Sequence, residues 1–244
     1  SRTSFDRELM HHIDNAQPQL VVLAGFMRIL TPDFTNHYAG RMLNIHPSLL
    51  PAYQGLNTHA RALADGASHH GCSVHFVTEE LDGGPVVLQA ELQVNPDDTV
   101  ETLKEKVHAR EHLIFPIAVQ WFLEGRLQYN AEGATMDGHP LPPYGMRLSH
   151  ADAAEELDEE LRGPGLAASP SVSTGDGLRP TADCSGGCKV VLGKRPRGAP
   201  LNCVFLPKCE RPQDVQGPHL SKRPPKGLNE RHPFLLSNHP YACV

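Results

Sequence analysis

Short apolar runs and amphipathic stretches alternate along the first 150 residues of the chain. Apolar side chains recur at helical spacing over residues 4–15, which predicts an amphipathic helix. The run QLVVLAGF (19–26) is continuously apolar, as is typical of a strand buried on both faces of a parallel sheet. RMLNI (41–45) predicts a second short strand, and helical patterns precede it at 31–40 and follow it at 57–66.

Two more strand-like runs and one long helix follow. CSVHFVT (72–78) and PVVLQAELQV (85–94) are predicted strands joined by EELDGG, and a helix is predicted over 99–124 with Asp98 as its cap. GRLQYN and ATMDGHPL then predict a hairpin that turns at Asp137-Gly138. Strands that alternate with helices predict an α/β fold, in which an open, mostly parallel sheet is flanked by helices in a Rossmann-like arrangement.

The character of the chain changes near residue 150. The stretch ADAAEELDEELR is acidic and helix-prone, and it gives way to Pro, Gly, Ser and basic residues without apolar periodicity. A segment of that kind cannot bury enough apolar surface to offset the entropy lost on ordering. We therefore predict a domain over 1–147, an acidic helix-prone linker over 148–162 and a disordered tail over 163–244.

Composition narrows the classes of function. The chain has 244 residues and a formal net charge of -6, and this mild acidity argues against a nucleic-acid binder, which needs a basic surface. No apolar run approaches the length of a membrane span. Only Cys72 falls within the first 150 residues, which favours a reduced, cytoplasmic domain. We expect a monomer or weak dimer that acts on small molecules.

The remaining cysteines lie in the last hundred residues, at Cys184, Cys188, Cys203, Cys209 and Cys243. A metal site is one interpretation of this cluster, but its spacings are looser than the paired C-x-x-C pattern of a zinc ribbon. The alternative is an unstructured tail that carries incidental cysteines. We favour this alternative and predict no metal.

Three polar residues stand where the predicted sheet would hold a ligand. Asn44 and His46 come at the end of a predicted strand, Asp82 lies in a Gly-rich loop, and ligand sites in open parallel sheets lie off the carboxyl ends of the strands. An Asn amide can donate to an oxyanion, a protonated His can do so and supply a proton, and a carboxylate orients the His. This set suits acyl transfer. The alternative stays open that His46 only ends a strand and that Asp82 belongs to an ordinary turn.

Three longer blocks carry a resemblance to a known family. VVLAGFMRIL, NIHPSLLP and SVHFVTEELDGGPVVLQA together resemble the phosphoribosylglycinamide formyltransferases, the folate-dependent enzymes of purine synthesis, over residues 1 to about 147. The resemblance implies that the amine of phosphoribosylglycinamide attacks the formyl carbon of the co-substrate 10-formyltetrahydrofolate. It also implies that Asn44 and protonated His46 stabilise the resulting oxyanion, while Asp82 keeps His46 charged.

The resemblance implies further binding residues. Those that would bind the folate, with Asn44, are Arg2, Met27, Arg28, Ile29, Leu30, Thr78, Glu79, Glu80, Leu81 and Asp82. Those that would bind the glycinamide substrate are His108 and Glu111. Core packing or solvated surface charge is the plainer alternative for each of them. His75 also fits the family's pattern, and a hydrogen-bonded core histidine is the alternative for it. The histidines without a match, His11, His12, His69 and His70, are expected at the surface.

The resemblance breaks at the start of the chain. The family opens with a strand and a Gly-rich loop that cradles the substrate phosphate, and nothing in this sequence supplies them. We therefore expect an N-terminally truncated domain with one sheet edge unpaired, and with impaired turnover because remote contacts help to position the reacting amine. Two alternatives stay open: a catalytically impaired folate-binding remnant, and another folate-dependent formyltransferase such as methionyl-tRNA formyltransferase.

Overall fold

The computed structural model describes residues 1–148, 179–183, 189–192 and 203–206. The helices are α1 (Arg2–Asn15), α2 (Pro32–His37), α3 (Thr58–Ala64) and α4 (Val100–Leu123). The strands are β1 (Leu20–Ala24), β2 (Met42–His46), β3 (His69–Phe76), β4 (Val86–Gln93), β5 (Leu127–Asn130), β6 (Gly133–Met136), β7 (His139–Pro140), β8 (Met146–Leu148), β9 (Arg179–Asp183), β10 (Lys189–Leu192) and β11 (Cys203–Leu206). None of these helices is both long enough and apolar enough to cross a membrane.

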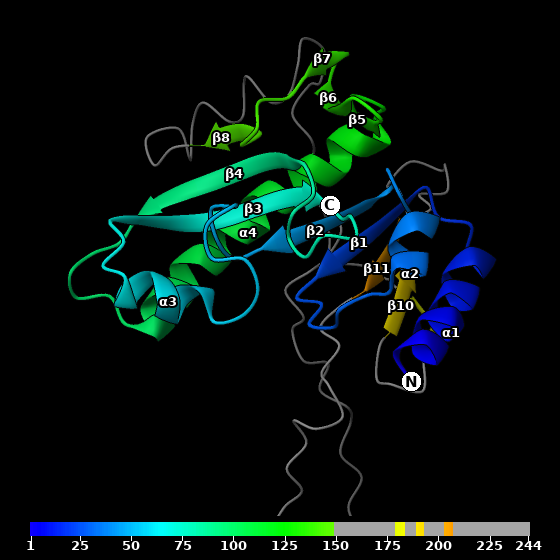
Figure 1. Cartoon of the computed structure of the whole chain (residues 1–244), viewed down its shortest axis with the longest axis horizontal. Coiled ribbons are helices and arrows are strands. Elements are labelled where there is room, and N and C mark those ends of the chain that lie inside the picture. The colour runs from blue at the N-terminus through cyan, green and yellow to red at the C-terminus, as the bar shows by residue number, and fades with distance from the viewer. Residues whose placement is uncertain (149–178, 184–188, 193–202, 207–244) are drawn as a thin grey trace, which may run out of the picture.

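The main sheet has the order β8-β4-β3-β2-β1-β11-β10-β9 and confirms the predicted open α/β architecture (Figure 1). Its pairing is mixed, which corrects the prediction of a mostly parallel sheet. β1 is parallel to β2 and β11, and β4 to β8, whereas β2, β3 and β4 pair antiparallel. The short connection between β3 and β4 accounts for their antiparallel pairing, because a parallel pair needs a crossover of a dozen or more residues.

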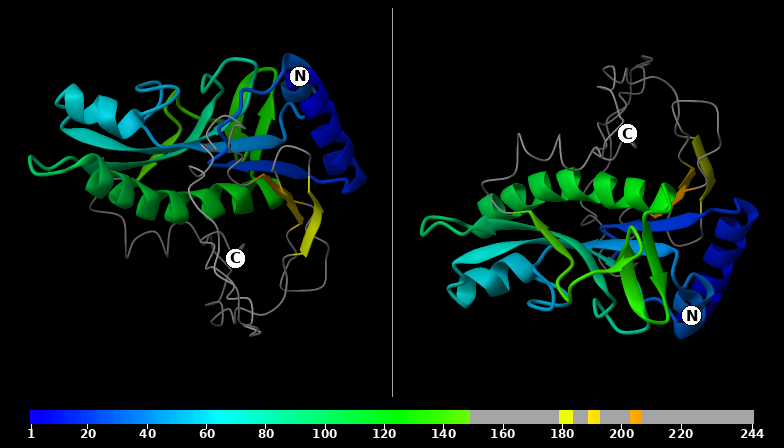
Figure 2. Two further views of the ribbon diagram at one scale, coloured as in Figure 1. Left: turned by 90° about the horizontal axis from the view of Figure 1, so that it is seen from below. Right: turned by 90° about the horizontal axis from the view of Figure 1, so that it is seen from above.

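Two apolar clusters fill the two faces of the sheet. Helix α4 runs along one face of the sheet and contacts β3 and β4 (Figure 2). Leu43 and Ile45 of β2 belong to the apolar cluster on this face. Met42 belongs to the second cluster, which contains α1 and α2. Since side chains alternate along a strand, Asn44 and His46 leave β2 on the same face as Met42.

Local sequence signals account for most of the ends of the helices and strands. Helix α2 begins with Pro32 after Thr31 as predicted, and the predicted hairpin is present, with β6 and β7 joined by Asp137-Gly138, both at positive φ. The predicted cap of α4 is wrong by one residue. Thr99 is the N-cap and forms a capping box with Thr102, while Asp98 pairs with Lys106.

The edge of the sheet beside β1 is paired. Strand β11, from the late part of the chain, runs parallel to β1, with Val204 opposite Val21 and Leu206 opposite Leu23. Both Val204 and Leu206 are buried in the α1 and α2 cluster, because their apolar side chains fill the position next to β1. In the part of 163–244 that is described, three strands therefore depart from the predicted disorder. The proposed linker and the rest of the tail, with Cys184, Cys188, Cys209 and Cys243, lie outside the described residues.

Candidate active site

Asn44 and His46 project from the last residues of β2, where the strand gives way to a tight loop. His46 is buried and Asn44 partly buried. The next residues turn away at once, with a cis peptide bond between Leu50 and Pro51 and positive φ at Tyr53. The prolines thus stop the strand and leave both polar side chains on one face of the sheet.

His75 of β3 holds the Asn44 amide. The two residues are paired across the β2–β3 ladder, and an amide N–H of Asn44 donates to His75 Nε2 at 3.0 Å. His75 Nδ1–H donates to the backbone carbonyl of Phe76 at 2.9 Å, which fixes the neutral tautomer that has Nε2 as acceptor. Burial lowers the pKa of His75 to about 4, so the ring is neutral near pH 7. An Asn amide carries two N–H groups, so the bond to His75 uses only one of them.

His46 lies between two oxygen acceptors. Its Nε2–H donates to the backbone carbonyl of Tyr53 at 3.0 Å, and its Nδ1 lies 3.4 Å from Asp82 Oδ2. His46 thus has an oxygen atom within reach of each ring nitrogen, and its contact with Asp82 ties the end of β2 to the loop after β3.

Asp82 completes the convergence predicted from the sequence. Its side chain is largely buried, and it accepts the Gly55 backbone N–H at 2.9 Å while Oδ1 lies 3.7 Å from His75 Nε2. The residue has a φ of 51°, and Gly84 beyond it lies so close to Phe76 that a Cβ would meet the Phe76 carbonyl oxygen. The two glycines after Asp82 thus let the loop fold back onto the sheet. Asn44, His46, His75 and Asp82 form one contiguous group.

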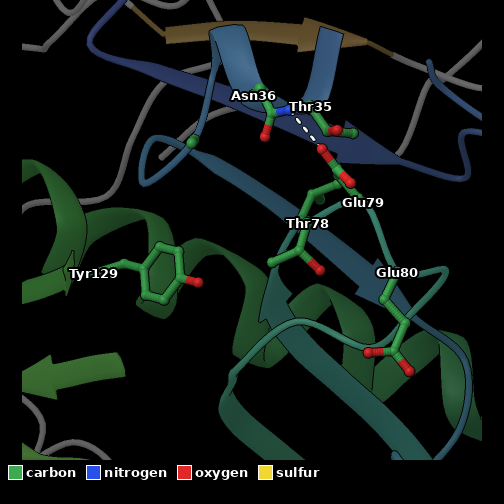
Figure 3. Close-up of a pocket in the computed structure, with 8 residues that line it drawn as sticks. Thr35, Asn36, Thr78, Glu79, Glu80 and Tyr129 are labelled. Carbon is green, nitrogen blue, oxygen red and sulfur yellow. Dashed lines mark hydrogen bonds between the residues drawn. The ribbon is translucent and has the colours of Figure 1, made fainter. Parts of the chain in front are cut away.

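The residues just before Asp82 line a cavity (Figure 3). Its volume is about 320 Å³, and its lining is Thr35, Asn36, Ala39, Val77, Thr78, Glu79, Glu80 and Tyr129. An Asn36 amide N–H donates to Glu79 at 2.5 Å, so α2 is tied to the loop. Of the predicted folate-binding residues, Thr78, Glu79 and Glu80 lie at this cavity, and the side chain of Leu81 is exposed.

Met27, Arg28, Ile29 and Leu30, four of the predicted folate-binding residues, follow the carboxyl end of β1. Met27 and Ile29 expose 43% and 55% of their surfaces, which excludes the plain alternative of core packing for these two residues. Leu30 packs on the α1 and α2 cluster, and the Arg28 guanidinium lies 3.8 Å from the centre of the Phe5 ring. Arg2 is exposed at the first position of α1.

His108 and Glu111 lie on α4, which packs on the sheet face opposite to Asn44. The side chain of Glu111 is buried next to Cys72, and burial raises its pKa to about 7. His108 is partly buried with its ring centre 4.4 Å from that of His112, and burial and the nearby His112 lower its pKa. These two residues are therefore near one another but belong to another layer than the Asn44 group.

His70 was expected at the surface, and that prediction is wrong, because the residue is only 1% exposed. It contacts His59 at 3.2 Å between ring nitrogens and lies against the Tyr53 ring, and burial lowers its pKa to about 4. The signal that could have found it is alternation. His70 shares the strand face of Cys72 and Val74, which the apolar pattern assigns to the core.

Comparisons with known proteins agree on one family. A profile described as formyl transferase matches residues 1–119. Phosphoribosylglycinamide formyltransferase of Escherichia coli K12 is 56% identical over 145 residues, which cover 59% of this chain and 68% of the relative. The Haemophilus influenzae protein of the same name is 46% identical over 140 residues, covering 57% and 66%.

A solved structure shows the same likeness. The phosphoribosylglycinamide formyltransferase of Coxiella burnetii is 55% identical in sequence and superposes with a TM-score of 0.59. The match covers 61% of this chain and 70% of that protein. The chain thus spans about two thirds of the length of the bacterial relatives it matches.

Proposed function

The chain belongs to the phosphoribosylglycinamide formyltransferase family, and we propose that it transfers a formyl group from 10-formyltetrahydrofolate to the amine of N1-(5-phosphoribosyl)glycinamide, a step of purine biosynthesis. The single observation that supports this most strongly is the convergence of Asn44, His46 and Asp82 at the end of β2. These are the three residues to which the resemblance in sequence gives catalytic roles.

The reaction requires a negative charge to be stabilised and a proton to be transferred. The amine nitrogen attacks the formyl carbon, a new C–N bond forms, and the formyl oxygen becomes an oxyanion. The bond from the formyl carbon to the folate nitrogen then breaks, that nitrogen takes up a proton, and the amine loses one. The protein must therefore stabilise an oxyanion and move a proton between two nitrogens.

The Asn44 group can meet both demands. The other N–H of the Asn44 amide, held by His75, would donate to the oxyanion, and the His46 imidazolium would add positive charge beside it. Asp82 would hold that imidazolium in place and help to carry the proton from the attacking amine. Because the groups are fixed by backbone contacts before substrate binds, little reorganisation is needed in the transition state.

The folate would occupy the surface between the β1 and β3 loops. A cavity of about 320 Å³ is in the range of small-molecule sites, and Thr78, Glu79 and Glu80 lead from it directly to Asp82. The exposed Met27 and Ile29 offer apolar surface to a flat ring, and the cations of Arg28 and Arg2 suit the carboxylates of a glutamate tail. The assignment of Glu111 and His108 to the glycinamide substrate rests on the resemblance alone, since both residues lie on α4, in another layer than the Asn44 group.

Further properties belong to the same proposal. We propose small-molecule substrates only, a cytoplasmic location, and a monomer or weak dimer. The folate serves as a co-substrate, and no metal takes part. The low turnover predicted from the sequence stays a prediction.

The test is a formyl-transfer assay on the full chain with 10-formyltetrahydrofolate and the glycinamide ribonucleotide. Wild type should form tetrahydrofolate only when both substrates are present, and Asn44→Ala should form none above background. Tetrahydrofolate and formate formed without the ribonucleotide would indicate hydrolysis instead. If the chain binds a folate analogue in calorimetry but shows no formyl transfer in the assay, the folate-binding remnant replaces the proposal.

A further inference from the structure

The loop from Tyr53 to Leu56 holds two members of the Asn44 group, His46 and Asp82. The Tyr53 carbonyl accepts from His46 Nε2, and the Gly55 N–H donates to the Asp82 carboxylate at 2.9 Å. The Gln54 side-chain amide also donates to the Asp82 backbone carbonyl at 3.2 Å. The position of this loop therefore sets how His46 and Asp82 face one another.

The loop has little regular structure of its own to hold it. Tyr53 and Gly55 both have positive φ, with values of 56° and 81°, and Gly55 carries no side chain that could pack. Tyr53, Gln54 and Gly55 are only partly buried, and Leu56 is exposed. The left-handed conformation is costly for Tyr53, and Gly55 is free to adopt other conformations, so a contact from outside the loop is expected to help fix this segment.

Arg61 supplies that contact from the first turns of α3. Its Nη1 donates to the Gln54 carbonyl at 2.7 Å and lies 3.5 Å from the Leu56 carbonyl. Its guanidinium carbon also lies 5.5 Å from the centre of the Tyr53 ring. One guanidinium thus reaches the loop at three successive places along it. A Lys could still donate to the two carbonyls, since both contacts come from Nη1, but it would lack the planar cation that lies beside the Tyr53 ring.

We propose that Arg61 is a positioning residue for formyl transfer, which clamps the Tyr53–Leu56 loop so that the loop holds His46 against Asp82. The inference rests on the proposed function for its catalytic meaning. Arg61 is exposed and touches no atom of the Asn44 group itself. Its effect passes through the backbone of Tyr53 and Gly55, and a misplacement of about 1 Å at a reacting group can lower a rate up to 100-fold.

The kinetic test compares Arg61→Met, which keeps the aliphatic stem, with Arg61→Lys and with Arg7→Met. Arg7 is an exposed arginine of α1 outside the proposed site, so it controls for the loss of one surface charge. We expect Arg61→Met to lower kcat about tenfold or more, with KM for the folate within about twofold and Tm within a few degrees of wild type. Arg61→Lys should recover part of kcat, and Arg7→Met should match wild type.

The second readout does not depend on turnover. Backbone amide exchange of Gly55 reports its bond to Asp82, and we expect Arg61→Met, but not Arg7→Met, to speed that exchange about tenfold. Unchanged Gly55 exchange in Arg61→Met overturns the proposal, as does faster exchange with kcat at the wild-type value. If wild type shows no transfer, the proposed function fails, and Gly55 exchange alone then decides whether Arg61 positions the pair.

Discussion

The stability of the fold should fall at low pH because of His75, and one substitution isolates this contribution. The ring is 2% exposed, donates from Nδ1 to Phe76 and accepts from Asn44 at Nε2. Protonation would place a charge out of reach of water and would remove the lone pair that Asn44 uses. His75→Gln removes the titrating group while it leaves a polar side chain able to hydrogen-bond at the same place.

The size of the effect follows from the pKa of His75. Burial lowers that pKa from 6.5 to about 4, and each pKa unit corresponds to about 1.4 kcal/mol of folding free energy. Because the unfolded chain binds the proton more readily, the stability from neutral His75 is fully present above pH 6.5 and is lost as the pH falls toward 4. His75 should therefore remove up to about 3 kcal/mol over that range.

Urea unfolding of wild type and His75→Gln at pH 7, 6, 5 and 4 measures this loss. All other titrating groups are common to the two proteins, so the difference between their unfolding free energies isolates His75. Wild type should lose about 3 kcal/mol more than the variant between pH 7 and pH 4. His70→Gln should flatten the profile to a similar degree, because burial also lowers the pKa of His70 to about 4. Parallel profiles for wild type and His75→Gln would refute the reasoning.

Three further substitutions test the site. Asp82→Asn should lower kcat by about 100-fold or more, while the affinity for a folate analogue, measured by calorimetry, changes little. Equal losses of affinity and of kcat would contradict the role of Asp82. Burial raises the pKa of Glu111 from 4.5 to about 7, so the stability contributed by the neutral carboxyl is fully present below pH 4.5 and is lost as the pH rises through 7. Glu111→Gln should therefore be about 3 kcal/mol more stable than wild type in urea unfolding at pH 8, and equally stable at pH 4.5. Gly84→Ala would bring a Cβ against the Phe76 carbonyl, so it should cost about 1–3 kcal/mol in the same unfolding assay and lower kcat by displacing Asp82.

The parts of the fold that the sequence predicts well are those decided by local patterns. Within the apolar run at 19–26, β1 (Leu20–Ala24) is a strand buried on both faces, as predicted. Asn44 and His46 stand at the end of the next strand, where a sheet presents polar groups. The cap of α4 shows the limit of local signals. Asp98, Thr99 and Thr102 are all good capping residues, and only the backbone position decides that Thr99 takes the role.

Other features depend on contacts between distant parts of the chain. The mixed pairing of the sheet follows from where the β3–β4 hairpin docks, which no apolar pattern encodes. The acceptors of His46 are a backbone carbonyl of Tyr53 and a loop carboxylate, and Asn44 is held by His75 from another strand. The Arg61 contact to the Gln54 carbonyl likewise needs the turn of the loop to be known. Such partners are set by tertiary packing.

The sequence predicts an open sheet edge, but β11 pairs with β1 at the edge beside it. This pairing can be tested by a last pair of substitutions. β1 ends just before Met27, so an unpaired edge beside it would loosen the segment proposed to bind the folate. Val204 is fully buried against the α1 and α2 cluster, whereas Val100 is 39% exposed at the start of α4. These two valines allow the same substitution to be compared at a buried and an exposed position.

Val204→Ala should lower the free energy of unfolding by about 2 kcal/mol, since it removes two buried methyl groups and leaves a cavity. Val100→Ala should change it by less than about 0.5 kcal/mol, as is usual for an exposed site. Urea unfolding with amide exchange of Val22 in β1 measures both effects, and exchange should quicken only in Val204→Ala. Equal, small effects of the two substitutions would mean that β11 does not belong to the folded sheet, and the stability of β1 would then have to come from its pairing with β2 alone.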